Sequence, residues 1–199
     1  MPSSNLTPEQ WLLTRFGDWE AVRDLHIEKP SLTMEQAAEI LAELSGKELL
    51  NLETGIVAQI NSRQANKLIS GAAADKSAAN GFTFGQHNAA AAKIAVLWKY
   101  ASLVSEGPDR SGDPNIQSIK RFVVPISLCG ETRVAWILAK ESVEHGHRIY
   151  TLELQEIKTL RGTLDTLESN TEKRTPARSV GQNLSSLEQN VNPEGGGKK

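Results

Sequence analysis

Cysteine is almost missing from this chain, because Cys129 is the single one among 199 residues. A lone thiol cannot form an internal disulfide, which fits a reducing cytosol, and its place between apolar residues and Gly130 favours a strand end over a catalytic thiol. Long apolar runs are missing too, since the stretch Val134–Ala139 is far too short to span a bilayer. The first residues carry no secretory pattern. We therefore expect a cytoplasmic protein without membrane contact, or one delivered into the cytoplasm of a host or target cell.

Known catalytic motifs are also missing. The sequence has no Walker glycine–lysine loop, no nucleophile elbow and no zinc-ligand spacing. Residues 109–115 begin like a calcium loop, but Pro114 replaces the required glycine and Lys120 replaces the bidentate acid. His145 and His147 form a His-x-His pair without a third ligand and are assigned to a turn. We expect no metal and no cofactor.

The charge is distributed unevenly, although the net charge is only −2. Residues 1–60 carry a net charge of −6, residues 61–162 carry +4, and residues 163–199 balance. A moderately basic centre favours a polyanionic partner, but a mixed solvated surface explains the same numbers.

Helix starts are marked by a threonine followed three positions later by a glutamine, the capping-box pattern. It occurs at Thr7, Thr33 and Thr83. The last of these begins the longest predicted helix, over residues 83–105. The alanine- and lysine-rich residues 62–79 predict one or two short helices broken near Gly71.

Strand-like composition follows the predicted long helix. The runs 121–128, 132–140 and 148–157 are separated by short turns and predict an antiparallel meander, with Pro125 at an edge or a bulge. Residues 55–60 add a further strand-like run. The fold class is therefore α+β, with about four strands.

The predicted organisation has three parts. Residues 1–47 form an N-terminal helical extension, residues 48–162 form the α+β domain, and residues 163–199 form a polar tail. The tail is too poor in apolar residues to offset the entropy of ordering, so we expect it to be disordered.

His87 is the first candidate functional residue, because it lies one turn into the predicted helix that begins at Thr83. One interpretation is packing, since Phe82 and His87 hold the two positions that touch in a hydrophobic staple. The other is chemistry, since a helix N-terminus lowers the pKa of an imidazole and attracts phosphate, as a general base for phosphate chemistry requires.

Several cations fall near element ends or on the strands expected to surround that helix, namely Lys67, Lys76, Arg121, Lys140 and Arg148. By strand alternation Tyr150 shares a face with Arg148. Solvated charge for the cations and core packing for the tyrosine are the alternative interpretations.

Residues from about 50 to 157 resemble a nuclease-like domain of large polyvalent proteins of phages and prophages. The superfamily is named after barnase, EndoU, colicin toxins and RelE. The resemblance rests on residues 51–60, 66–70, Lys76, Ser77, His87, residues 89–94, 112–116, 121–125, 133–141 and 150–154.

This resemblance implies helices packed on a curved antiparallel sheet and metal-independent RNA cleavage. A base would remove the ribose 2′-hydroxyl proton, an acid would protonate the leaving 5′-oxygen, and cations would hold the developing charge. We assign His87 as base or acid, Lys76, Arg121 and Lys140 to the phosphate, and Tyr150 to a base or to the histidine. Lys67 and Arg148 would bind the nucleic acid, Lys67 at the periphery.

The functional prediction is an RNA-cleaving toxin or host-modifying effector of mobile-element origin. Its partners would be RNA and a cognate immunity or antitoxin protein. A non-catalytic module that binds nucleic acid or protein, and a purely structural accessory segment, remain as alternatives.

Overall fold

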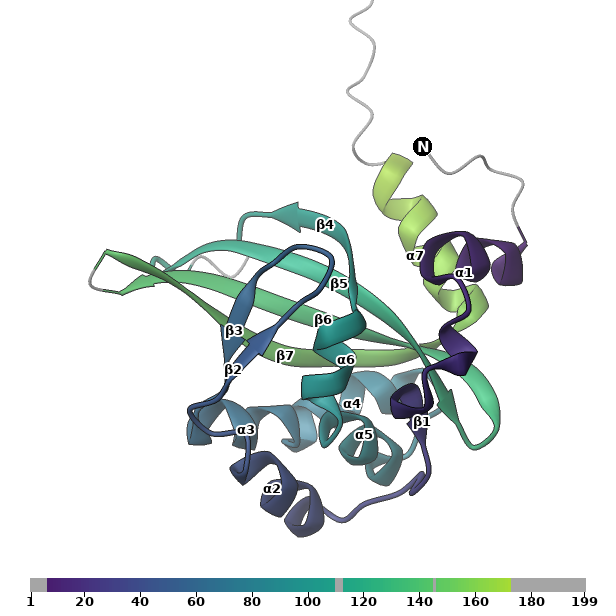
Figure 1. The fold of residues 1–199 in the computed structure, drawn as a ribbon, viewed down its shortest axis with the longest axis horizontal. Coiled ribbons are helices and arrows are strands. Elements are labelled where there is room, and N and C mark those ends of the chain that lie inside the picture. The colour runs from purple at the N-terminus through teal and green to yellow at the C-terminus, as the bar shows by residue number, and fades with distance from the viewer. Residues whose placement is uncertain (1–6, 110–112, 145, 173–199) are drawn as a thin grey trace, which may run out of the picture.

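We analysed a computed structural model of the chain, which describes residues 7–109, 113–144 and 146–172 (Figure 1). Its centre is a seven-stranded sheet in the order β1-β5-β6-β7-β3-β2, with β4 also paired to β5. The strands are β1 (His26–Ile27), β2 (Glu48–Leu50), β3 (Val57–Gln59), β4 (Ser102–Gly107), β5 (Ile116–Leu128), β6 (Glu131–Glu144) and β7 (His147–Thr159).

The α+β class is confirmed, but the predicted number of strands is wrong. The antiparallel meander of β5, β6 and β7 lies where the sequence predicts it, with longer strands. Segments of two or three residues extend the sheet: β1 pairs parallel with β5, and β3 pairs parallel with β7. β3 lies within the strand-like run predicted over residues 55–60, whereas β1 and β2 have too few residues to show an alternating pattern and were not predicted.

Helices cover the sheet, and the sequence predicts the starts of α1, α2 and α5 but not those of α6 and α7. They are α1 (Pro8–Phe16), α2 (Met34–Ala42), α3 (Ser62–Leu68), α4 (Gly71–Ala79), α5 (Phe84–Ala91), α6 (Ile94–Tyr100) and α7 (Leu160–Glu172), with 3₁₀ turns η1 (Trp19–Ala21) and η2 (Arg23–Leu25). The capping boxes at Thr7, Thr33 and Thr83 are all present, and a break separates α3 from α4 at Gly71 as predicted.

The single long helix predicted over residues 83–105 is wrong, because the structure divides this stretch into α5, α6 and β4. Asn51 accounts for the end of α6. This completely buried side chain donates hydrogen bonds to the carbonyl oxygens of Trp98 and Ala101, at 2.7 and 2.8 Å. The Trp98 carbonyl also accepts the backbone N–H of Ala101, at 3.2 Å, and the residues after Ala101 pair with β5 instead of continuing the helix.

The two faces of the sheet have different covers. One face packs on α6, where the rings of Trp98 and Phe122 meet edge to face at 4.6 Å between centroids, and on α3, α4 and α5. The other face is covered by α7, where the Trp136 indole donates to Thr163, and α1 packs on α7. Figure 1 shows α1 and α7 together, away from the β6–β7 hairpin tip. The strands therefore continue beyond these two helices.

The predicted boundary of the polar tail is also wrong for residues 163–172, which belong to α7. Thr163 is completely buried, and Leu164 and Leu167 pack on the main core. Residues 173–199 lie outside the described residues. The core that α7 joins also contains Trp11 and Leu41, from the predicted N-terminal extension.

Pro125 lies in the gap between two neighbours of β5. β4 pairs with β5 up to Val123, and β1 pairs with it from Ser127. Pro125 therefore has a strand partner on one side only, at Val134, as the prediction of an edge position requires. Among the described residues, no helix combines the length and the apolar composition needed to cross a membrane.

Candidate nucleic-acid interface

His87 is completely buried between three helices and the edge of β7. Its Nε2 lies 2.9 Å from the carbonyl oxygen of Leu68, and its Nδ1 lies 2.8 Å from the hydroxyl of Ser77. A carbonyl only accepts, so Nε2 carries the proton and Nδ1 accepts the Ser77 hydroxyl hydrogen. The same hydroxyl accepts the backbone N–H of Ile157 at 3.0 Å. The imidazole thus joins α3, α4 and α5 to β7 through a chain of satisfied bonds.

This environment favours the neutral ring. Burial lowers the pKa of His87 below its ordinary value, and the hydrogen bond to the Leu68 carbonyl opposes that effect only in part. A ring without exposed surface, with both nitrogens bonded, cannot exchange a proton with a substrate unless it first leaves this position. The catalytic role of His87 stays a prediction, and the geometry gives it no support.

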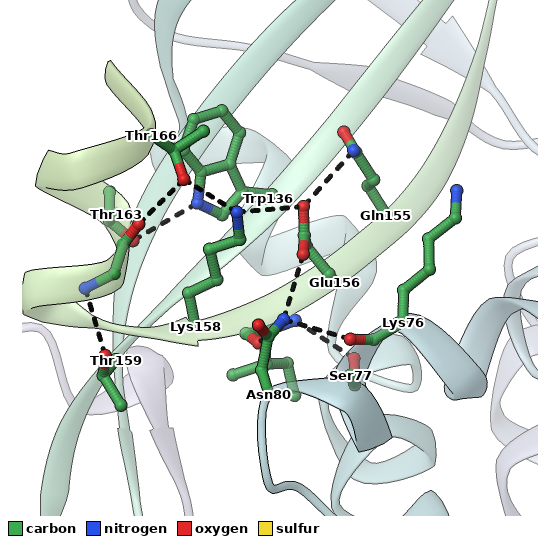
Figure 2. Close-up of polar contacts among 12 residues, drawn as sticks. Lys76, Ser77, Asn80, Trp136, Gln155, Glu156, Lys158, Thr159, Thr163 and Thr166 are labelled. Atoms are coloured by element: carbon green, nitrogen blue, oxygen red, sulfur yellow. Dashed lines mark hydrogen bonds and ion pairs between the residues drawn. The ribbon is translucent and has the colours of Figure 1, made fainter. Parts of the chain in front are cut away.

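A polar network continues along the edge of β7 and holds α4 and α7 beside the strand (Figure 2). Asn80 donates to the side chain of Glu156 and to the carbonyl of Ile157, each at 3.0 Å. Lys158 pairs with Glu156 at 3.4 Å and donates to Thr166 of α7 at 2.8 Å. The bonds of Asn80 and Ser77 occupy the carbonyl and the N–H of Ile157, on a part of the β7 edge beyond the point where β3 pairs with the strand at Thr151.

Arg121 and Lys140, two of the predicted phosphate ligands, lie on the same face of the sheet. Arg121 pairs with Leu138 in the register, and Lys140 is two residues further along β6, so alternation places them together. Glu153 of β7 lies opposite Leu138 on this face, and its carboxylate contacts the Lys140 ammonium at 2.8 Å. We call these three residues the sheet-face cluster. It belongs to the face that carries Trp136, on the stretch that runs beyond α7.

Tyr150 and Arg148 lie on the opposite face, in a second charged group. Lys120, only 8% exposed, contacts Glu106 and lies 3.2 Å from Glu141, which is 5% exposed. Arg148 reaches Glu141 at 3.4 Å, and the Lys120 ammonium lies 5.9 Å from the centre of the Tyr150 ring. We call Lys120, Glu141, Glu106, Arg148 and Tyr150 the inner-face cluster.

The charges of the inner-face cluster hold one another in the ionised state. Burial alone would lower the pKa of Lys120, but hydrogen bonds and attraction from Glu106 and Glu141 raise it above its ordinary value. Burial alone would raise the pKa of Glu141, but hydrogen bonds from Ser118 and Lys120 hold it below its ordinary value. Two cations balance two carboxylates, so this cluster is suited to fixing the strands together rather than to exchanging protons.

Lys67 and Lys76 are exposed on α3 and α4, the helices that lie along β7. The structure therefore divides the seven predicted residues among four places. It brings together Arg121 with Lys140, and Tyr150 with Arg148, and it leaves His87 in the interior.

Sequence reasoning missed the acidic members of both clusters. Glu153 and Glu141 stand in strands of alternating pattern, where a single acidic residue resembles ordinary solvated charge. Aligning the predicted strands with each other could have identified Glu153. Once β6 and β7 are aligned, Lys140 and Glu153 occupy diagonal positions on one face of the sheet. Among the described residues, no group of three or more potential ligands for a metal ion comes together.

Comparison with known proteins identifies a family. The family model of large polyvalent protein-associated domain 3 matches residues 31–150, more than half of the chain, from just before α2 to the first part of β7. No curated protein and no solved structure matches.

Proposed function

Because the chain belongs to the family of large polyvalent protein-associated domain 3, we propose that it is a nucleic-acid-binding module of a phage polyvalent protein. RNA is the proposed ligand. Its phosphates would meet the sheet face at Arg121 and Lys140, the predicted phosphate ligands that lie together.

The proposal is carried by the position of these two cations on one face of β5 and β6, on the stretch that continues past α1 and α7 toward the β6–β7 hairpin tip. Lys140 is one-quarter exposed, and so is its partner Glu153. A nucleic-acid backbone that displaces the carboxylate from the ammonium gains a charge-assisted contact. Antiparallel sheets are established platforms for single-stranded RNA, since side chains stand out from them at regular spacing.

The test compares two variants that lose the same charge. R121Q/K140Q removes the cations of the sheet face, and K67Q/K76Q removes two exposed cations of the helices. With a fluorescent single-stranded RNA, we expect the first variant to bind at least about tenfold more weakly, with a salt slope reduced by about 1.4 for two lost phosphate contacts. The second variant should bind like the wild type. Equal losses in both variants would refute a specific interface on the sheet face.

RNA cleavage without a metal is the second candidate, and the contact between Lys140 and Glu153 favours it. The Glu153 carboxylate would accept the 2′-hydroxyl proton as the 2′-oxygen bonds to phosphorus. The bond from phosphorus to the 5′-oxygen then breaks, and that oxygen takes a proton from the Lys140 ammonium. Arg121 would hold the charge that develops on the phosphate.

Cleavage and binding are separated by E153Q, which keeps the size of the side chain and removes the base. If the chain is a nuclease, the wild type cuts RNA in the presence of a metal chelator, and E153Q binds RNA without cutting it. Intact RNA after long incubation with a wild type that binds it would restrict the function to binding.

A further inference from the structure

A hollow of about 320 Å³ lies outside the charged clusters, where α1 and η1 meet the start of β6 and the start of α7. Apolar side chains form part of its wall, among them the almost completely buried Trp19 and the 66% exposed Leu13. Its lining consists of Glu9, Leu12, Leu13, Gly17, Asp18, Trp19, Glu20, Thr132 and Leu160.

The charge of this hollow has one sign. Three carboxylates line it, from Glu9, Asp18 and Glu20, and no lysine or arginine does. None of the three takes part in an ion pair within the part of the chain that the structure describes. An apolar floor with an unneutralised acidic rim is complementary to a segment that carries both aliphatic and basic side chains.

The position of the hollow indicates that it is not part of the family's common framework. All its lining residues except Thr132 lie outside the matched stretch 31–150, in α1, η1, the link between them and α7. Leu13 is 66% exposed, so the fold of the chain leaves most of this apolar side chain in contact with water. A docked partner would bury it.

We propose that this hollow docks a short peptide segment of a partner protein, in which leucine-like side chains alternate with lysine or arginine. The aliphatic groups would cover Leu13 and Trp19, and the cations would face Glu9, Asp18 and Glu20. The volume lies at the lower end of the range for ligand pockets, on the order of 300 Å³, which fits two or three side chains rather than a folded domain. This surface is separate from the proposed RNA interface.

The probe for the test is an acetylated hexapeptide amide of alternating leucine and lysine, added to the full chain. Binding is followed by the indole N–H signal of Trp19 in a proton–nitrogen NMR spectrum. The indole of Trp98 is buried and bonded to the Leu49 carbonyl, so its signal is the internal control. We expect the Trp19 signal to shift in a saturable way and the Trp98 signal to stay in place.

Two triple variants of equal charge decide the site. E9Q/D18N/E20Q should weaken binding about tenfold, since three exposed charge contacts each contribute a few tenths of a kcal/mol. E28Q/E39Q/E48Q removes three exposed carboxylates elsewhere and should leave the affinity unchanged. L13S should weaken binding without a change in net charge.

Three results would overturn the proposal. The first is an unmoved Trp19 signal at millimolar peptide. The second is an equal loss of affinity in both triple variants, which would reduce the effect to overall charge. The third is peptide binding that appears only when residues 173–199 are deleted, because the occupant would then be the chain's own C-terminal segment.

Discussion

The buried imidazole of His87 gives the sharpest prediction for stability. His87→Ala removes a side chain without exposed surface, leaves the Leu68 carbonyl without its donor, and deprives the Ser77 hydroxyl of its acceptor. An unsatisfied buried carbonyl and a cavity of this size together cost about 3–5 kcal/mol. Since small domains are stable by roughly 5–15 kcal/mol, this is a large share of the total.

The assay is urea unfolding followed by circular dichroism, with His26→Ala as the control. His26 is less buried, and its Nε2 lies 3.0 Å from the carbonyl oxygen of Glu20, so the loss of this ring should cost about 1 kcal/mol or less. A double-mutant cycle of His87→Ala with Ser77→Ala should give a coupling of about 1 kcal/mol or more. If His87→Ala unfolds at the same urea concentration as the wild type, the ring does not hold α3, α4 and α5 on β7.

The pH dependence follows from the same burial. The pKa of His87 in the folded chain is lower than its ordinary value of 6.5. At any pH between these two pKa values, the unfolded chain therefore binds more protons than the folded chain. The free energy of unfolding therefore falls as the pH drops below about 6.5, by at most about 1.4 kcal/mol per pH unit, until the folded pKa is passed. In His87→Ala, the free energy of unfolding should depend less steeply on pH in this range. An unchanged dependence on pH would show that the ring titrates normally.

Two further variants probe the framework. Asn51→Ala should cost about 3 kcal/mol, because the buried amide donates to two carbonyls at the end of α6 and accepts two hydrogen bonds from Thr54. The exposed Asn66→Ala should change stability by less than about 0.5 kcal/mol. Lys120→Met should cost about 3 kcal/mol at pH 7, since it leaves the Glu141 carboxylate buried without its main cation. In the wild type, protonation of Glu141 removes this ion pair, so the free energy of unfolding falls as the pH drops from 4.5 to the folded pKa of Glu141. Lys120→Met should make this fall smaller. Additive losses for Lys120→Met and Glu141→Gln in thermal unfolding would contradict the pairing.

Local patterns predicted the local structure well. The capping boxes at Thr7, Thr33 and Thr83 each begin a helix, because the cap is decided by residues three positions apart. The strands of the meander were found for a similar reason, since alternation and short turns act over a few residues.

Tertiary contacts decided what the sequence missed. The end of α6 depends on Asn51, 47 residues away from Trp98, and β4 forms because an edge of β5 is available to it. Helix periodicity over residues 83–105 carries no trace of either partner. The same applies to α7, where the hydroxyl of the buried Thr163 accepts a hydrogen bond from the indole N–H of Trp136 on β6.

The candidate site was predicted residue by residue with mixed results. Arg121 and Lys140 share a face because strand alternation fixes it, and Tyr150 lies with Arg148 for the same reason. For His87 the sequence left two interpretations, packing in a hydrophobic staple and catalysis, because the capping pattern at Thr83 is compatible with both. Only the packing of α3 and α4 around the ring separates these two interpretations.

The most direct test of the account is a map of backbone amide signals during titration with a short single-stranded RNA. If the open sheet face is the interface, the largest shifts fall on the segments around Arg121, Lys140 and Glu153, and the segments around His87 and Lys76 stay unmoved. Shifts centred on α3 and α4, with those three strand segments unmoved, would contradict the account.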